Sequence, residues 1–225
     1  MCGRFTLTAP EDAIIDHFNL AEPLVEYQPR YNVAPGQQVL AVVNDGRQNT
    51  IKRFKWGLVP FWTKDPKMGY STFNARAETV ATKAAFREPL KRSRTLIVAD
   101  GFFEWLALSK KEKQPMRFLL KSKEVYGFAG LWDTWRGPDG TILETCTIIT
   151  TTPNDVVKDV HDRMPVILPR QNEQAWLDPG TQDTDFLQSL LQPYPADEMF
   201  SYPVSTLVGN VRNDSVDLIE ELNSK

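Results

Sequence analysis

The sequence predicts an α+β fold in which strands occupy the middle of the chain and short helices lie towards both ends. Short apolar runs rich in β-branched and aromatic residues recur up to residue 151. The helical patterns do not alternate regularly with these runs, as they would in a doubly wound α/β protein. With 225 residues, 41% of them hydrophobic, the chain can bury one sizeable core. We therefore expect a single domain over residues 1–225.

Residues that favour turns separate the predicted strands. Asn, Asp, Gly and Pro gather at 44–46 and 137–140, and a lysine-rich segment lies at 109–114. Residues 4–6 are predicted to be a short strand that ties the N-terminus into the sheet, whereas residues 30–36 have the composition of a turn-rich loop. The remaining strands are predicted at 39–43, 51–56, 95–99, 117–120, 125–128 and 146–151.

Four short helices are predicted around these strands. Thr8 and Glu11 have the spacing of a capping box, which would begin a helix that Asn19 ends. Thr152 and Pro153 supply an N-cap and a first-turn proline for a helix directly after a strand. The other two helices are predicted at 171–177 and 185–191.

The composition argues against several classes of protein. Cys2 and Cys146 lie far apart in the sequence, which favours two free thiols over one disulfide. The two histidines do not have the spacing of metal ligands. We expect no metal and no other cofactor. The longest apolar runs are far shorter than the roughly 20 residues of a membrane-spanning helix, and no export signal follows Met1. We therefore expect a cytoplasmic protein with no membrane partner, associated with the nucleoid if the source is bacterial.

Charge is distributed unevenly along the chain. The net charge is −3, yet residues 51–125 carry seventeen Lys and Arg against seven Asp and Glu, and the remainder is acidic, including a tail at about 214–225. This segregation favours a groove that attracts phosphates over general binding to polyanions. Lys110, Lys111 and Lys113 also fit a solvated turn between strands.

Cys2 becomes the N-terminal residue if Met1 is removed. A terminal cysteine has two nucleophiles on adjacent carbon atoms, since its α-amine has an unperturbed pKa of about 7.7–8.0 and its thiol one of about 8.5. Such a 1,2-aminothiol condenses with an aldehyde to an imine, and the thiol then closes a thiazolidine ring. The alternative is an ordinary residue in a frayed terminus. Cys146 lies in a predicted buried strand, and we interpret it as core.

Aromatic and basic side chains are interleaved at the start of the basic region. Trp56, Phe61 and Trp62 lie among four Lys and Arg side chains. This pattern suits single-stranded nucleic acid, where bases stack on rings and cations hold phosphates. Trp56 fits a core position, whereas Phe61 and Trp62 follow a proline in a loop-like stretch and are expected on the surface.

Three further segments carry polar side chains suited to chemistry. Asn74, Arg76 and Glu78 alternate and would share one face of an extended segment, although a solvent-facing row on an edge strand has the same pattern. Glu104 stands between aromatic residues, and burial by their rings would raise its pKa. His161, with an unperturbed pKa near 6.5, is the candidate general acid or base. A structural histidine bonded to the loop backbone is the alternative.

Taken together, these segments resemble the SOS-response-associated peptidase (SRAP) family. The resemblance extends from Cys2 to Val211 and implies one domain with a mostly antiparallel, barrel-like β-sheet and short flanking helices. Six ordered motifs carry it, namely MCGRF at 1–5, RYNVAPG at 30–36, WGLVPFW at 56–62, NARAE at 74–78, DGFFEW at 100–105 and HDRMP at 161–165.

The resemblance implies a protein that senses abasic sites in single-stranded DNA. It would link itself through Cys2 to the ring-opened sugar aldehyde and shield the lesion. The resemblance also implies an autopeptidase activity that exposes Cys2, and an imine that would support strand cleavage as a lyase. Single-stranded DNA is the implied partner, and we expect a monomer.

The resemblance also assigns roles to individual residues. Cys2 would be the nucleophile, Asn74 would hydrogen-bond near the sugar or the terminus, and Glu104 would handle the amine proton. His161 would assist opening of the sugar ring. The residues implied in DNA binding are Arg4, Arg76 and Arg163 as phosphate contacts, and Asn32, Pro35, Phe61 and Trp62 as the lining or wedge of the DNA path.

Two other functions are open at this point. A thiol peptidase acting on other proteins would use Cys2, Glu104 and His161 and would need no DNA. A noncovalent single-strand binding module would need no Cys2. Salt-sensitive affinity for single strands separates DNA capture from the peptidase, and a Cys2-dependent adduct separates it from the binding module.

Overall fold

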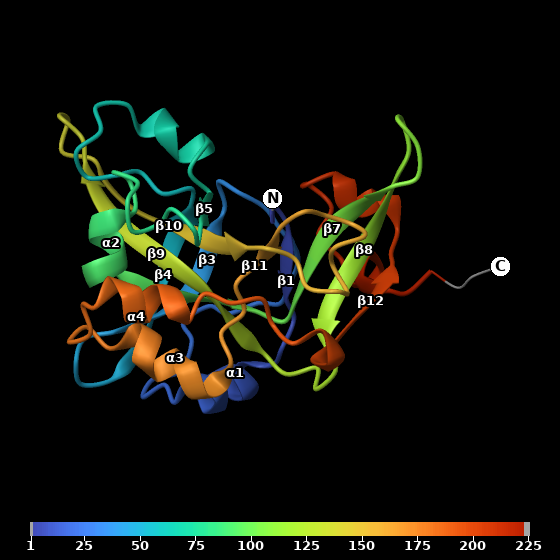
Figure 1. The fold of residues 1–225 in the computed structure, drawn as a ribbon, viewed down its shortest axis with the longest axis horizontal. Helices are drawn as coiled ribbons and strands as arrows, with labels where there is room; N and C mark the ends of the chain where they lie inside the picture. Colours follow the sequence, from blue (N-terminus) through green and yellow to red (C-terminus); the bar gives the residue numbers. More distant parts are fainter. Residues whose placement is uncertain (1, 223–225) are drawn as a thin grey trace.

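The computed structural model describes residues 2–222. Met1, whose removal is expected, and the last three residues of the acidic tail lie outside the described residues. Two β-sheets form the centre of the molecule, with α1, α3 and α4 together along one side (Figure 1). The helices are α1 (Glu11–Phe18), α2 (Arg87–Arg92), α3 (Arg170–Leu177) and α4 (Thr184–Ser189), with short 3-10 helices η1 (Pro66–Tyr70), η2 (Ala196–Glu198), η3 (Thr206–Gly209) and η4 (Val216–Ile219).

The larger sheet closes on itself. Strands β10 (Ile142–Thr151), β4 (Asn49–Trp56), β3 (Gln38–Asn44), β6 (Arg94–Ala99) and β9 (Tyr126–Arg136) pair in this order, and β9 pairs again with β10. These five strands therefore form a barrel. β5 (Asn74–Arg76) and β11 (Met164–Pro165) also pair with β10. Most pairs are antiparallel, but β10 runs parallel to β4 and β5. The predicted α+β class and barrel-like sheet are confirmed.

The smaller sheet carries the N-terminal strand. Its order is β12 (Met199–Pro203), β8 (Lys113–Leu120), β7 (Gly101–Ala107), β1 (Phe5–Leu7) and β2 (Arg30–Val33), with every pair antiparallel. β6 of the barrel continues into β7 through Asp100 alone. The two sheets thus share one uninterrupted stretch of chain.

Alternating apolar side chains divide the core in two. Leu40 and Val42 belong to a cluster with residues from all four α-helices. Val39 and Ala41, which alternate with Leu40 and Val42 along β3, belong to a second cluster, together with Phe5 of the smaller sheet. Because neighbouring strand residues point to opposite faces, the helices cover the outside of the barrel. The barrel interior continues into the smaller sheet.

The predicted capping box before α1 is wrong. The hydroxyl of Thr8 donates to Asp100 at 2.8 Å, and the carboxylate of Glu11 accepts from the backbone N–H of Leu24 at 2.7 Å. The helix begins after Pro10 without a side-chain cap. Both side chains therefore hydrogen-bond to residues outside the helix terminus instead of forming the capping box that their spacing predicts. Asn19 does end the helix, in the left-handed conformation (φ 49°).

Two other local predictions are also wrong. After Pro153 the chain makes successive turns over 155–160 instead of a helix. The side chain of Asn154 accepts from the N–H groups of Val156 and Val157 at 3.1 and 3.2 Å. The first half of the expected loop 30–36 is strand β2, because it pairs with β1. Within residues 2–222, no helix has both the length and the apolar character needed to cross a bilayer.

Candidate active site

Cys2 lies three residues before the first residue of β1, inside the protein. The N–H of Phe103 on β7 donates to the carbonyl of Arg4 at 2.9 Å, and this antiparallel register, continued by one residue, places Glu104 opposite Gly3 and thus next to Cys2. The Cys2 side chain is fully buried in the second core cluster. Burial, assisted by the nearby charge of Glu104, raises the pKa of its thiol well above its usual range. The thiol is therefore protonated at neutral pH.

β7 carries the Glu104 carboxyl into the interior. Glu104 is 3% exposed, and its Oε1 has no hydrogen-bond partner within residues 2–222. Burial raises its pKa from 4.5 to about 8. The expectation that burial would raise this pKa is confirmed. Most Glu104 side chains carry a proton at pH 7, and the group can gain or lose it close to neutral pH.

His161 approaches Glu104 from a distant part of the chain, between the turns at 155–160 and β11. Its Nε2 lies 4.0 Å from Oε2 of Glu104. The backbone N–H of Arg163 lies 3.0 Å from Nδ1, and a carboxylate oxygen of Asp162 lies 3.1 Å from the same nitrogen. Burial lowers the pKa of the imidazole. His161 is therefore neutral near pH 7, with the backbone of Arg163 and the carboxylate of Asp162 at its Nδ1 and Glu104 near its Nε2.

Cys2, Glu104 and His161 form the site trio. Near pH 7 it consists of a thiol, a protonated carboxyl and a neutral imidazole, so no net charge is buried. A nucleophile near a carboxyl that itself lies near an imidazole can add to a carbonyl or imine carbon and pass the released proton to these groups. Within residues 2–222, no group of three or more side chains is arranged to bind a metal.

Asn74 and Arg76 lie on β5, beside β10. Asn74 Nδ2 donates to the carbonyl of Phe73 at 3.1 Å, while Oδ1 is buried with no partner among the described residues. The Arg76 side chain is exposed and makes no hydrogen bond or ion pair with the rest of the described chain, although its charge contributes to the lowered pKa of Glu78. Glu78 lies beyond the end of this strand. The shared face expected for these three residues therefore extends only over Asn74 and Arg76.

Arg163 is held in an ion pair. Its guanidinium donates to both carboxylate oxygens of Glu78, at 2.7 and 2.9 Å, and to the carbonyl of Thr150 at 2.6 Å. These hydrogen bonds lower the pKa of Glu78. A phosphate at Arg163 would have to compete with a bidentate carboxylate.

Arg4 and Asn32 lie inside the protein. Asn32 is fully buried, and its Oδ1 accepts from Arg4 at 2.7 Å. Its Nδ2 donates to the carbonyls of residues 208, 210 and 213 at 3.2, 3.1 and 2.7 Å. The Arg4 guanidinium also donates to Val208 and lies 5.5 Å from the ring centre of Trp105. Both side chains fasten the segment 208–213 to β2 and to the N-terminal residues that precede β1.

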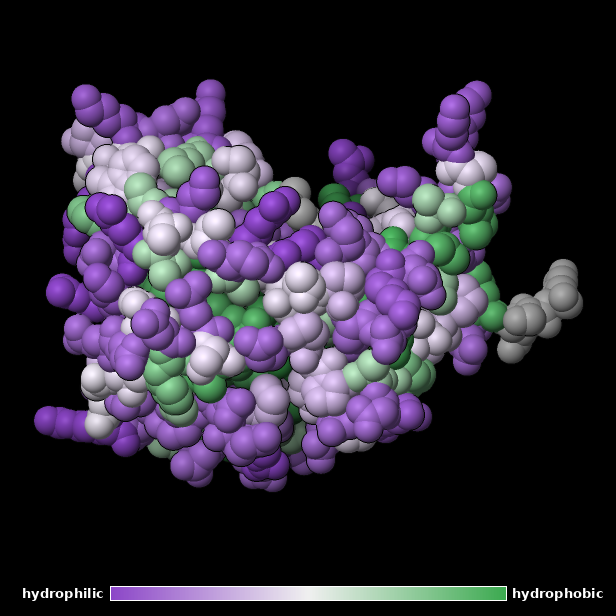
Figure 2. All heavy atoms as spheres, in the orientation of Figure 1, coloured by the Kyte–Doolittle hydropathy of each residue, from purple (hydrophilic) through white to green (hydrophobic). Residues whose placement is uncertain are grey.

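Phe61 and Trp62 lie on the surface, as expected, with exposures of 61% and 49%. Together with residues of α2 they line a cavity of about 300 Å³ that contains none of the site trio. Pro35 is half-buried in the loop after β2. The molecular outline is hollowed between the projection that bears η1 and the tip of the β7–β8 hairpin, above the start of β1 (Figures 1 and 2).

The model of the SOS response associated peptidase (SRAP) family matches residues 1–211. The chain belongs to the SRAP family. Abasic site processing protein YoqW of Bacillus subtilis is 53% identical to this SRAP protein over 98% of this chain and 99% of that protein. Abasic site processing protein HMCES of Xenopus tropicalis is 31% identical over 84% of this chain and 65% of that protein.

Crystal structures of proteins from other organisms have the same fold. A crystal structure of a protein from Bacteroides thetaiotaomicron has a TM-score of 0.88 and 25% sequence identity, covering 99% of this SRAP chain and all of that chain. A second, from Bordetella bronchiseptica, has a TM-score of 0.76 over 91% of this chain. The two-sheet architecture is therefore shared at low sequence identity.

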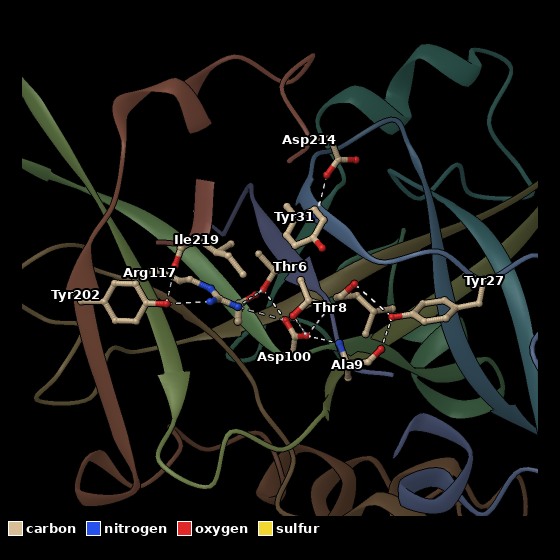
Figure 3. Close-up of polar contacts among 12 residues, drawn as sticks. Thr6, Thr8, Ala9, Tyr27, Tyr31, Asp100, Arg117, Tyr202, Asp214 and Ile219 are labelled. Carbon is tan, nitrogen blue, oxygen red and sulfur yellow. Dashed lines mark hydrogen bonds and ion pairs between the residues drawn. The ribbon is translucent and has the colours of Figure 1, made fainter. Parts of the chain in front are cut away.

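A buried polar network positions the N-terminal strand of this SRAP protein (Figure 3). Asp100, between β6 and β7, accepts hydrogen bonds from Thr6, Thr8 and Ala9. Arg117 on β8 donates to Thr6 at 3.1 Å and lies 3.7 Å from Asp100. Asp100 is part of the DGFFEW motif, but the sequence offered no sign of its partners. The network secures β1, which follows Cys2 in the chain, against β7, which carries Glu104.

Replacing Asn32 with alanine is expected to destabilise the protein by about 2–4 kcal/mol. The change removes the acceptor of Arg4 and the amide donor to the carbonyls of residues 208, 210 and 213. Val208 still accepts from Arg4 and Asn210 from the N–H of Asn213, but the buried amide is lost and the carbonyl of Asn213 loses its donor, which has a substantial cost. In a chain of this size the melting temperature should fall by roughly 5–15 °C, measured by calorimetry. If Asn32 instead contacts DNA, Asn32→Ala will weaken DNA binding and leave the melting temperature unchanged.

Proposed function

We propose that this SRAP protein processes abasic sites in single-stranded DNA by forming a covalent bond through Cys2. The relatives reported above are named abasic site processing proteins. The observation that carries the proposal is the position of Cys2, which is second in the chain and close enough to Glu104 to feel its charge, while Glu104 lies 4.0 Å from His161. An aldehyde on a ring-opened sugar is the electrophile that an aminothiol at this position would capture.

Removal of Met1 is the first step of the proposal. One water hydrolyses the amide bond between Met1 and Cys2, which releases methionine and leaves the α-amine of Cys2. In an autopeptidase reaction the Cys2 thiol would attack the carbonyl carbon of Met1, and its proton would pass to the departing amine. Glu104 or His161 would carry this proton, and water would then release the acyl group from sulfur.

Capture follows in two bond-forming steps. The Cys2 amine adds to the aldehyde carbon of the open sugar, and loss of one water gives a protonated imine. The sulfur then adds to the same carbon, its proton passes to Glu104 or His161, and the nitrogen keeps the electron pair of the imine bond. A thiazolidine results. Because the thiol is protonated before reaction, we propose that the amine attacks first.

The protonated imine also supports lyase chemistry. It acidifies the hydrogens on the next sugar carbon, and loss of one such proton allows elimination of the phosphate on the 3′ side. Ring closure by sulfur removes the imine and so competes with strand cleavage. We propose that the ratio of stable adduct to cleaved strand depends on how quickly Cys2 closes the ring.

The remaining assigned residues divide between DNA contact and positioning. Arg76 is exposed and unpaired within the described chain, so it would hold a phosphate. Phe61 and Trp62 would stack on or separate bases near the lesion, and Pro35 would line the path. Asn74 would direct its buried Oδ1 to the amine or sugar. Arg4, Asn32 and Arg163, with all their contacts inside the protein, would act by positioning. One chain supplies all of these groups, so we propose a monomer.

Incubation with a single-stranded oligonucleotide bearing one abasic site tests the proposal. Intact mass should show loss of the methionine mass from the protein and a one-to-one adduct, which persists in denaturing electrophoresis. An oligonucleotide with an ordinary nucleotide at that position should give none. Salt-sensitive binding without an adduct would instead indicate a noncovalent module, and hydrolysis of other proteins without DNA affinity would indicate a peptidase.

Replacing Arg76 with alanine is expected to weaken binding of single strands of any sequence. Loss of one phosphate contact should lower the slope of log affinity against log salt by about 0.7–1, measured by fluorescence anisotropy between low and physiological salt. Arg47 provides the matched control because it is exposed on the β3–β4 turn, at the other end of β3 from Pro35. Equal slopes for Arg76→Ala and Arg47→Ala would show that Arg76 does not contact a DNA phosphate.

A further inference from the structure

A small cavity opens between the loop after β2 and the loop that carries η1. Its volume is about 200 Å³, and Lys55, Lys67 and Tyr70 contribute to its lining. Trp56 and Val59 supply apolar surface. The volume lies below the range of about 300–1,000 Å³ of pockets for larger ligands. A single ring or phosphate group is the scale of ligand that it suits.

Backbone contacts hold this cavity in shape. Gly57 has a φ of +136°, and a Cβ there would lie 2.5 Å from the carbonyl oxygen of Gly69, so only glycine allows the two ends of the loop to meet. The hydroxyl of Thr72 donates to Leu58 and Met68 at 2.5 and 2.9 Å. The loop is therefore closed on itself at its base. A ligand would meet a preformed surface and would not have to order the loop.

The charge of the cavity favours an anion. Two lysines and no carboxylate contribute to its lining, whereas each of four other cavities among the described residues includes at least one Asp or Glu. Tyr70 is 74% exposed, so its ring is available for stacking. Lysines beside an exposed ring are the combination that binds single-stranded nucleic acid.

The cavity also adjoins the candidate active site. Trp56 forms part of its lining, and the same ring lies 5.3 Å from the ring of Phe5 and 6.2 Å from that of Phe73, between centres. Phe5 shares a core cluster with Cys2, and Phe73 directly precedes Asn74. One aromatic side chain therefore separates the cavity from the core around the nucleophile.

We propose that this cavity binds one nucleotide of the DNA strand that flanks the abasic site. The ring of Tyr70 stacks on the base, and Lys55 and Lys67 hold its phosphate. This inference rests on the proposed function for the identity of the strand. Binding of this nucleotide provides a second contact between protein and DNA, outside the site trio. This contact fixes the position of the lesion relative to Cys2.

Fluorescence anisotropy with a single-stranded oligonucleotide of ordinary nucleotides tests the cavity apart from the covalent chemistry. Tyr70→Ala should weaken binding roughly ten-fold, and Tyr70→Phe should retain affinity because the ring remains. Lys67→Gln should lower the salt slope by about 0.7–1. Phe186→Ala and Lys121→Gln are the matched controls, since both residues are exposed and neither lines the cavity.

A series of abasic oligonucleotides, lengthened by one nucleotide at a time on each side of the lesion, locates the bound nucleotide. The defect of Tyr70→Ala should appear only once the strand is long enough on one side. If the Tyr70 and Lys67 variants have the same affinities and salt slopes as the controls at every length, the cavity is not a nucleotide-binding site. Failure of the wild-type protein to form an adduct would overturn the proposed function instead, because binding of ordinary strands does not depend on that chemistry.

Discussion

Replacing Cys2 with alanine is expected to abolish the adduct that resists denaturation while leaving affinity for single-stranded DNA within about two-fold of wild type. The phosphate contacts lie on other residues, and the lost thiol is buried. Without sulfur the thiazolidine cannot close, and the imine hydrolyses during denaturation. The yield of adduct on a denaturing gel and the anisotropy of a labelled strand measure the two effects separately.

Borohydride distinguishes the amine from the thiol in the same variant. If Met1 is removed from Cys2→Ala, the new terminal amine still forms an imine, and hydride reduction converts it to a stable secondary amine. Adduct should therefore return with borohydride. Cys146→Ala is the matched control, because Cys146 is also a fully buried thiol whose pKa burial raises, and it should form the adduct normally. A stable adduct in Cys2→Ala without reductant would exclude the thiazolidine.

Replacing Glu104 with glutamine is expected to stabilise the protein at neutral pH. The unfolded chain releases this proton near pH 4.5 and the folded protein near pH 8. Between these values the folded state binds more protons than the unfolded state, so the wild type loses about 1.4 kcal/mol per pH unit as pH rises. Glutamine removes this loss, and the gain should be about 3 kcal/mol at pH 7 and absent below pH 4.5. Urea unfolding at several pH values measures it.

The same variant should form adduct roughly 100-fold more slowly, a typical contribution of a general acid or base. The wild-type rate should rise with pH towards 8 as the carboxylate that accepts the amine proton becomes available, and the variant should lack this rise. Glu173 is the matched control for stability, because it is buried but paired with His17 at 3.1 Å. Glu173→Gln should destabilise. Destabilisation by Glu104→Gln at pH 7 would mean that the native protein satisfies both carboxyl oxygens.

Stability and activity would then oppose one another at Glu104. A buried carboxyl with an unpartnered oxygen lowers stability, but it places a proton carrier with a pKa near 8 beside Cys2. Evolution retains such groups where function requires them. Asn32 shows the reverse arrangement, because its amide oxygen accepts from Arg4 and its amide nitrogen donates to backbone carbonyls.

Patterns that depend on neighbouring residues predicted much of the fold. Short apolar runs rich in β-branched and aromatic residues indicated β3, β4 and β6, and Asn19 correctly ended α1. Prediction failed where a distant group competed for a side chain. Thr8 hydrogen-bonds with Asp100 in preference to its own helix, and β2 forms because β1 lies beside it. These partners are far away in sequence, so local spacing contains no information about them.

By itself the sequence determined the α+β class and the cysteine at position two, and it predicted that burial would raise the pKa of Glu104. It did so because periodicity and immediate neighbours are local properties. Only the tertiary structure decided that β9 and β10 close a barrel, that His161 meets Glu104, and that Arg4 and Asn32 point inward. Whether a polar side chain faces DNA or the protein interior depends on which distant groups satisfy its hydrogen bonds, and folding alone brings those groups together.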